Sequence, residues 1–248
     1  MTFTVLARDT RLGLIGAATA SKSFAVGSSV IAVDPTVGAV ASQAWTNQAL
    51  RGLLLDELRR GVTATEAVTK VPSWDDEPEL RQVSALAWHD PGGARSGSGI
   101  TSWAGQRVEA SAVFTGNLLV GPEVIEAMAG AWASYRSQDA SHFAATLIAV
   151  LAAGDAAGGD TRGRQSAAVL VASRTSVVLD RRVDDDPAPL EVLAVLAQGA
   201  GQPGRGGGVQ GPRRLGAGPA LEVDEDGEVL AAGPGDEASE ELDPGPGG

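Results

Sequence analysis

Thr2 directly follows the initiator methionine, and a residue this small at the second position permits removal of Met1. Removal would leave an α-amine and a hydroxyl group on the same residue. An unperturbed α-amine has a pKa of about 7.7 to 8.0, so it can accept the proton of its own side-chain hydroxyl and activate that oxygen as a nucleophile. Many intracellular chains begin with Met-Thr and use it for no chemistry, so support for Thr2 must come from the residues around it.

Two predicted strands, residues 3–8 and 14–21, are joined by a short polar turn and form a hairpin. In an antiparallel hairpin of this length, paired residue numbers sum to about 22 to 24, which places Thr2 opposite position 20, 21 or 22. Ser21 and Lys22 therefore arrive beside Thr2, Ser21 as a candidate substrate contact and Lys22 as a candidate catalytic cation. A cation there would favour the neutral amine and stabilise developing negative charge. The simpler interpretation is a solvated lysine at a strand end, and without further support it is favoured.

A glycine-rich segment, residues 154–166, joins a predicted helix to a predicted strand and contains Asp160, Arg162 and Arg164. Arginines held by such a backbone can present paired donors to a substrate carboxylate. Equally, the segment can be a helix end followed by a rigid turn in which aspartates hold the arginines. Asp160, Arg162 and Arg164 are our candidate substrate-binding residues.

Asn117 ends a predicted strand shortly before a helix, so its amide could donate to an oxyanion or cap the turn. Other motifs are weak or missing. Residues 199–204 match a dinucleotide fingerprint only formally, because they follow no strand and contain proline. Neither a Walker phosphate loop nor a nucleophile elbow occurs. The run 184–186 of three aspartates is better explained as a solvated loop than as a cation site.

These candidates must be positioned by strands and helices that come in groups. Besides the hairpin, strands are predicted at residues 37–45, 83–89, 99–103, 110–115, 167–172 and 177–180. Helices are predicted at residues 48–60, 63–71, 123–135, 141–153 and 190–197, with a capping box formed by Thr63 and Glu66. Paired helices between runs of strands predict an α+β fold with mainly antiparallel sheets, and two face-to-face sheets with helix layers outside fit this order.

Composition limits the function further. The 248 residues carry a net charge of −12, contain no cysteine and have two histidines. We therefore expect no nucleic-acid partner, no metal site and no cofactor. No apolar run is long enough to span a membrane and no signal peptide is recognisable, which predicts a cytoplasmic protein. Residues 199–248 are rich in glycine, proline and acidic residues, and we predict a disordered tail after a domain at residues 1–198.

Several stretches together resemble the domain-of-unknown-function family 1028 (DUF1028). The resemblance covers essentially residues 1–198 in order. The stretches that carry it include MTFTV at 1–5, ASKSFAVG at 20–27, VGAVASQA at 37–44, GNLL at 116–119, GDAAGGDTRGRQSAA at 154–168 and RVDD at 182–185. The run at 154–168 is the most specific of them.

That family is grouped with the N-terminal-nucleophile hydrolases, so the resemblance implies a four-layer αββα sandwich, Thr2 as the nucleophile and amide-type bonds as the substrate class. It implies no particular substrate and no established role for Lys22 or Asn117. The sequence departs from the usual family pattern at Ile100, where cysteine is common, and at Gln106 and Asp186, where histidine is frequent. Thr2 and Lys22 are unaffected by these changes.

The leading hypothesis is hydrolysis of a small amide, of non-peptide or acyl-amino-acid type, by Thr2 after removal of Met1. Lys22 would stabilise charge, Asn117 or a nearby backbone N–H would hold the oxyanion, and Arg162 or Arg164 would recognise a substrate carboxylate. The alternative is a non-catalytic, oligomeric binding protein that keeps the same sandwich. A homo-oligomer is compatible with either hypothesis, because helix-covered sandwiches often assemble through their outer faces.

Overall fold

The N-terminal hairpin forms the centre of the larger of two sheets. The computed structural model of the chain describes residues 2–101, 103–136 and 139–198. Strand β1 (Thr2–Asp9) pairs with β2 (Leu14–Ser21), and Gly13 closes the turn with a positive φ of 64°. Such a φ suits glycine because it has no Cβ. The predicted hairpin is confirmed: β1 is one residue longer at each end than predicted, and β2 has the predicted bounds.

Two antiparallel sheets make up the middle of the fold. The larger has the strand order β10-β9-β2-β1-β8-β7, and the smaller has the order β3-β4-β5-β6. The further strands of the larger sheet are β7 (Gly105–Val108), β8 (Ala112–Asn117), β9 (Ser166–Ser173) and β10 (Val177–Val183). Those of the smaller sheet are β3 (Ile31–Asp34), β4 (Gly38–Ala44), β5 (Arg81–Ala87) and β6 (Gly93–Ser96).

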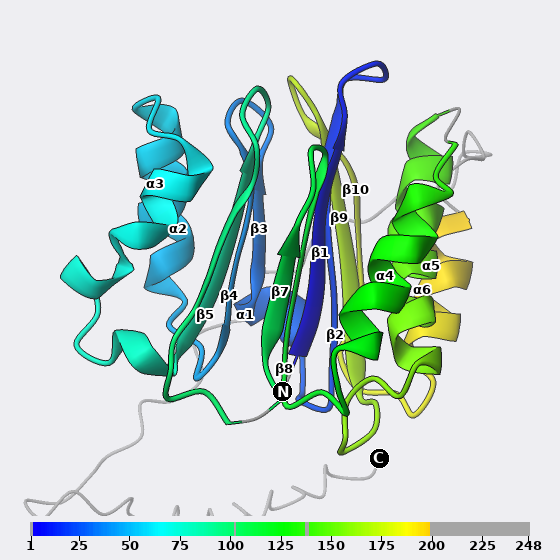
Figure 1. Cartoon of the computed structure of the whole chain (residues 1–248). Coiled ribbons are helices and arrows are strands. Elements are labelled where there is room, and N and C mark those ends of the chain that lie inside the picture. The colour runs from blue at the N-terminus through cyan, green and yellow to red at the C-terminus, as the bar shows by residue number, and fades with distance from the viewer. Residues whose placement is uncertain (1, 102, 137–138, 199–248) are drawn as a thin grey trace, which may run out of the picture. The chain divides into compact units, whose positions relative to one another are not determined.

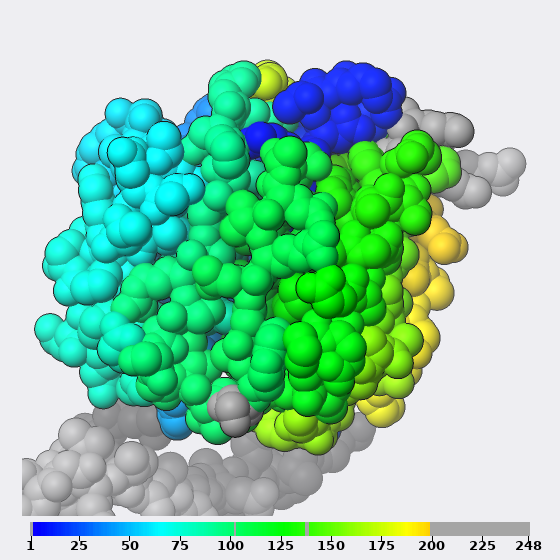
Figure 2. Space-filling view, viewed as in Figure 1, coloured from blue at the N-terminus to red at the C-terminus, as the bar shows by residue number. Residues whose placement is uncertain are grey.

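Helices cover the outer face of each sheet, as Figure 1 shows. In the space-filling view of Figure 2, the cyan segments of α2 and α3 lie on one side of the molecule and the green to yellow segments of α4, α5 and α6 on the other. On the smaller sheet lie α2 (Ala49–Arg59) and α3 (Ala64–Thr69). On the larger sheet lie α4 (Glu123–Ala133), α5 (Ala140–Ala156) and α6 (Pro189–Gln198). Three short helical turns complete the elements: α1 (Val26–Ser29), Val71–Ser73 and Pro78–Leu80. The layers are therefore helix, sheet, sheet, helix, and the predicted αββα sandwich is confirmed.

The side chains of β1 point alternately into two hydrophobic cores. Phe3 and Val5 pack toward α4 and α5, whereas Leu6 belongs to the core between the two sheets. Because successive side chains of a strand point to opposite faces, Thr2 and Thr4 share the face of Leu6. Thr2 therefore points toward the second sheet and not toward the helices.

The helix predictions hold with small shifts at the ends. The capping box is present, since the Thr63 hydroxyl accepts from the Glu66 backbone N–H while the Glu66 carboxylate accepts from Thr63. Helix α5 begins one residue earlier than predicted because Asp139 accepts from the His142 backbone N–H as its N-cap.

The strand predicted at residues 99–103 is wrong. The chain there connects β6 to β7, and the backbone N–H groups of Gly97 and Gly99 donate to the carbonyls of Arg81 and Glu79. A Cβ on Gly97 would come within 2.2 Å of the Glu79 carbonyl oxygen, so glycine is required at this close approach. Strand β3 was missed because only four residues form it, too few for a clear periodic pattern.

The tail prediction, its fingerprint at 199–204 and the domain boundary at residue 198 lie outside the described residues or at their edge. Within the described part of the chain, no helix is long and apolar enough to cross a membrane.

Candidate active site

Thr2 lies at the end of β1, between the ends of two neighbouring strands. The register pairs Thr2 with Ser21 of β2 on one side and with Asn117 of β8 on the other. The Thr2 hydroxyl donates to Ser21 Oγ at 3.4 Å, and all three residues are buried. The prediction that Thr2 lies opposite position 20, 21 or 22 is therefore confirmed. A second candidate, Asn117, reaches Thr2 through a strand far away in sequence.

A buried network of neutral polar side chains lies next to Thr2 between the sheets. Thr4 Oγ1 is 2.8 Å from Thr19 Oγ1 and donates to Gln43 Oε1 at 2.6 Å. The amide of Gln43 in turn donates to the Thr2 carbonyl oxygen at 3.3 Å and to Gln82 Oε1 at 2.7 Å. Because Gln43 and Gln82 belong to the smaller sheet, these bonds fix the end of β1 against the opposite sheet.

Gln82 orients the side chain of Asn117. Its Oε1 accepts from Asn117 Nδ2 at 3.1 Å, and its Nε2 is shared among Ser96 Oγ, the Gly105 carbonyl and the Gly116 carbonyl. Gln82 is fully buried. One N–H of the Asn117 amide is thereby directed at Gln82, and the amide carries a second N–H with which to bind a ligand.

A cavity of about 250 Å³ opens beside Asn117. Its lining includes Ser23, Trp45, Ile100, Thr101, Leu118 and Arg162. Ala44 also lines it, and both Ala44 and Leu118 have positive φ values, 73° and 55°. Left-handed backbone at non-glycine residues costs about 1 to 3 kcal/mol and gathers at functional sites. Ala44 is the last residue of β4 and Leu118 directly follows β8, so each comes immediately after a network amide, Gln43 or Asn117.

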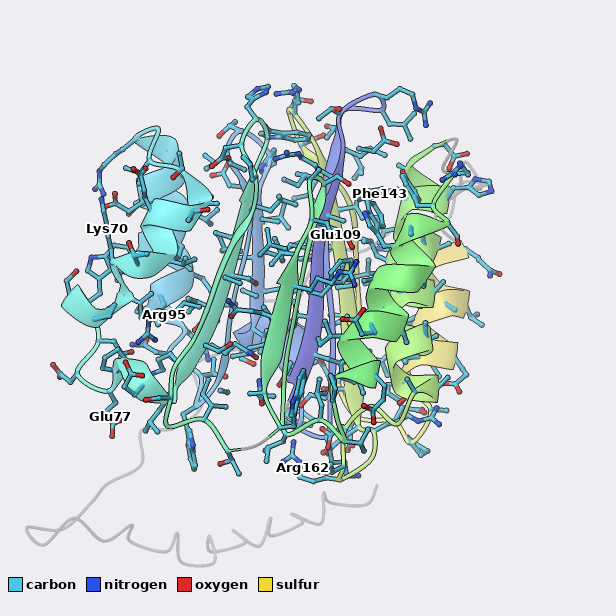
Figure 3. The ribbon with its side chains drawn as sticks, viewed as in Figure 1. Lys70, Glu77, Arg95, Glu109, Phe143 and Arg162 are labelled. Carbon is cyan, nitrogen blue, oxygen red and sulfur yellow. The ribbon has the colours of Figure 1, made fainter. Side chains whose placement is uncertain are left out.

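Arg162 faces this cavity, held by Asp160. The Asp160 carboxylate accepts from Arg162 Nε and Nη2, both at 3.3 Å, and from the Arg162 backbone N–H at 2.8 Å. The same carboxylate accepts from the Lys22 backbone N–H at 2.9 Å, and its side chain is 2% exposed. Figure 3 shows Arg162 at the end of the sandwich where β1 begins. Asp160 is therefore a positioning residue that joins the end of β2 to Arg162, a more internal role than the substrate contact we predicted.

Lys22 and Arg164 lie elsewhere than the hypothesis requires. The Lys22 ammonium donates to the Arg164 carbonyl oxygen at 3.2 Å, and no hydrogen bond joins it to Thr2 among the described residues. The Arg164 guanidinium is paired with Asp155 of α5 and Glu191 of α6. Lys22 lies just beyond the end of β2, and Arg164 lies in the irregular segment before β9, within reach of the acids of α5 and α6.

An ion pair supports the cavity from the side of the smaller sheet. Arg81 donates to the Trp45 carbonyl oxygen at 2.7 Å and, through Nε, to Asp75 Oδ2 at 2.9 Å. Asn47 donates to the same carboxylate oxygen at 2.7 Å. The hydrogen bond from Arg81, opposed by desolvation and aided by Asn47, lowers the pKa of Asp75 to about 2. The backbone of Trp45 is thus fixed although its side chain is 64% exposed.

All three aspartates at 184–186 accept hydrogen bonds from other residues of the chain. Arg182 Nε donates to Asp184, Gln165 donates to Asp185, and Asp186 accepts from the Ala188 backbone N–H. Among the described residues, no three histidine, aspartate or glutamate side chains come together in a way that could hold a metal ion.

Gln43 and Gln82 are the functional candidates that sequence reasoning missed. A signal for them was available, because Gln43 has the same parity as the buried Ala39 and Ala41 in β4. A glutamine at an inward-facing position of an apolar strand must find hydrogen-bond partners in the core. Alternation along a strand does not predict which residues of the opposite sheet those partners are.

The fold and this site together define a protein class: a two-sheet αββα sandwich whose first strand begins with a threonine that faces the polar network between the sheets. The family described as "Family of unknown function (DUF1028)" matches residues 2–193. The chain therefore belongs to the DUF1028 family, and the predicted resemblance is confirmed.

The chain is also similar to proteins of known structure. The crystal structure of protein SPO2555 from Silicibacter pomeroyi, of the DUF1028 family, is 32% identical, with a TM-score of 0.73 over 80% of this chain and 88% of that chain. Anbu (ancestral beta-subunit) from Yersinia bercovieri is 14% identical, with a TM-score of 0.37 over 82% of this chain and 98% of that chain. None of the curated proteins searched matches the chain.

Proposed function

We propose that this protein hydrolyses a small amide with Thr2 as an N-terminal nucleophile, after removal of Met1. The observation that carries the proposal is the register, which puts Thr2 between Ser21 and Asn117 at the mouth of the sandwich. A cavity lined by Asn117 lies beside it. Thr2 itself is not among the lining residues, but its β8 partner Asn117 is, so a nucleophile, an amide donor and space for a small substrate lie next to one another, as acyl transfer requires.

The reaction proceeds through an ester. The Thr2 α-amine takes the hydroxyl proton as Oγ1 attacks the amide carbonyl carbon, and the Asn117 amide donates to the developing oxyanion. The ammonium then returns its proton to the leaving nitrogen, which departs as the free amine. Water, deprotonated by the same α-amine, attacks the ester carbonyl and releases the acid together with the Thr2 hydroxyl.

The neutral character of the neighbouring network supports the choice of the α-amine as base. The Thr2 hydroxyl donates to Ser21 and the Thr2 carbonyl accepts from Gln43, and the residues behind these two are threonines and a glutamine. None of these side chains can take a proton near pH 7. A neutral, buried surrounding also disfavours the charged form of an amine, which keeps it available as a base.

The test compares one protein in two N-terminal forms. A cleavable fusion placed directly before Thr2 yields the free amine, and a form with an uncleavable extension retains the blocked nitrogen. A panel of small amides and acylated amines is screened with both. We expect turnover only from the free form, and a loss of more than about 10³-fold in kcat/KM for Thr2→Ala. Turnover that is unchanged in Thr2→Ala or in the blocked form would disprove the mechanism.

Two further variants calibrate the result. Thr2→Ser keeps both reacting groups and should retain measurable activity. Thr69→Ala makes the same change as Thr2→Ala on the exposed end of α3, so its activity should equal that of the wild type. If Met1 is retained in the native host by intact-mass analysis and neither form turns over any amide, the non-catalytic binding protein becomes the better account.

A further inference from the structure

The cavity beside Asn117 combines one fixed cation with an apolar wall. Arg162 is the only ionisable side chain among the described residues that line it. Trp45, Ile100 and Leu118 supply the apolar part. From this arrangement, and resting on the proposed function, we infer that the substrate carries a carboxylate bound by Arg162 next to the scissile amide and an apolar group that packs on Trp45.

The anchoring of Arg162 explains why it can select by shape as well as by charge. Asp160 fixes the edge of the guanidinium that carries Nε and Nη2, and the Arg162 side chain, 43% exposed overall, lines the cavity. Because Asp160 is itself held by backbone donors, the guanidinium plane is set before a ligand arrives. A pre-oriented guanidinium matches the planar, two-oxygen geometry of a carboxylate and loses little entropy on binding.

The charge balance favours a carboxylate over a more highly charged anion. Asp160 offsets most of the charge of Arg162 through their ion pair, and the remaining lining is neutral. A phosphate monoester carries nearly two negative charges at pH 7, for which this cavity supplies too little compensation. A monoanionic carboxylate adds one negative charge to this pair, about half of what a phosphate monoester adds.

The spacing between the carboxylate site and the scissile bond is set by short connections. Leu119, two residues after Asn117, forms a β-bridge with Asp160, which lies two residues before Arg162. The segments that carry Asn117 and Arg162 are therefore joined directly, and both residues line the same cavity of about 250 Å³. A small ligand that engages both within this cavity fits the chemistry of an N-acyl amino acid, whose carboxylate lies a few bonds from its amide.

Trp45 provides the apolar contact. An exposed tryptophan usually needs no explanation, but this one has its backbone fixed on both sides, by the Leu80 carbonyl and by Arg81. The cavity volume of about 250 Å³ lies just below the range of about 300–1,000 Å³ found for drug-sized ligands. The part of the ligand that enters the cavity is therefore small, such as a single side chain or a short acyl chain.

The experiment measures binding separately from turnover. Calorimetry on the Thr2→Ala protein, produced with its N-terminus free, compares N-acetyl-L-leucine with N-acetyl-L-leucinamide, two probes that differ only in the carboxylate. We expect the carboxylate probe to bind about 10- to 100-fold more tightly. Arg162→Gln should abolish this preference, and Arg162→Lys should restore part of it. Equal affinities for the two probes, or no binding of either, would overturn the inference.

Matched controls separate the site from general effects. Arg107 has the same 43% exposure and is also paired with acids, but lies on β7, so Arg107→Gln should leave the preference intact. Trp45→Ala should weaken both probes by the same factor. Phe24→Ala removes an aromatic side chain that is 68% exposed and is not among the cavity residues, and should change neither affinity. A loss of preference in Arg107→Gln would contradict the assignment.

The two proposals fail in different ways. Carboxylate-selective binding without turnover of any amide would reject the hydrolase mechanism and leave the binding site standing. If the form with a free Thr2 turns over amides with and without a carboxylate equally well, and Arg162→Gln does not change KM, the mechanism stands and the substrate class is rejected.

Discussion

Replacing Gln82 by leucine tests whether the buried network holds the site together. Gln82 contributes two N–H donors and one carbonyl oxygen that accepts from Gln43 and Asn117, so it makes up to four full hydrogen bonds. Leucine has a similar volume and makes none of them. Asn117, which is 1% exposed, then loses its hydrogen bond from Nδ2 to Gln82.

The size of the effect follows from these contacts. At about 1 kcal/mol for each of four bonds, the loss is about 4 kcal/mol, and the added apolar burial of leucine returns about 1 to 2 kcal/mol. The free energy of unfolding should fall by about 2 to 3 kcal/mol. For a domain of this size, that lowers Tm by about 4 to 12 °C.

The assay is thermal unfolding followed by calorimetry, with Gln106→Leu as the matched control. Gln106 also bonds Ser96 and a backbone carbonyl, but it is exposed, so its loss should change stability by less than about 0.5 kcal/mol. Gln82→Leu should also lower amide turnover, because Asn117 is no longer oriented. A Tm within about 2 °C of the control would refute the claim that the network stabilises this end of the sandwich.

Two further predictions concern stability. The pKa of Asp75 is lowered to about 2 by its pairing with Arg81, so its contribution is complete above the unfolded pKa of about 3.9 and is lost as pH falls toward 2. Denaturant unfolding of wild type and Asp75→Asn should therefore differ by about 1 to 2 kcal/mol at pH 5 and converge near pH 2, and a difference that does not depend on pH would contradict this. The second prediction pairs two Gly→Ala changes with opposite effects on the free energy of unfolding. Gly93→Ala puts a Cβ 2.4 Å from a backbone oxygen of α3 and should lower this free energy by about 1 to 3 kcal/mol. Gly52→Ala, at an exposed position of α2 with open space around it, should raise it by about 0.5 to 1 kcal/mol in the same urea titrations. Equal effects would show that the crowding at Gly93 is relieved without cost.

The sequence by itself determined the parts of the site that depend on local geometry. The hairpin of β1 and β2 has a short turn, so its register, and with it the pairing of Thr2 with Ser21, follows from counting residues. The capping box of Thr63 with Glu66 is equally local. The order of helices and strands predicted an α+β fold with mainly antiparallel sheets, because each amphipathic element must cover another, and the family resemblance added the four-layer αββα arrangement.

The tertiary structure alone decided which distant residues share the site. Asn117 reaches Thr2 through β8, and Gln43 and Gln82 reach it from the opposite sheet, contacts whose partners no local pattern specifies. It also decided between two similar arginines, directing Arg162 to the cavity and Arg164 to the acids of α5 and α6. Side-chain direction depends on how a glycine-rich segment folds against its neighbours, since glycine leaves the backbone free to turn either way. Residue types could suggest the chemistry here, but only packing could select the residues that meet.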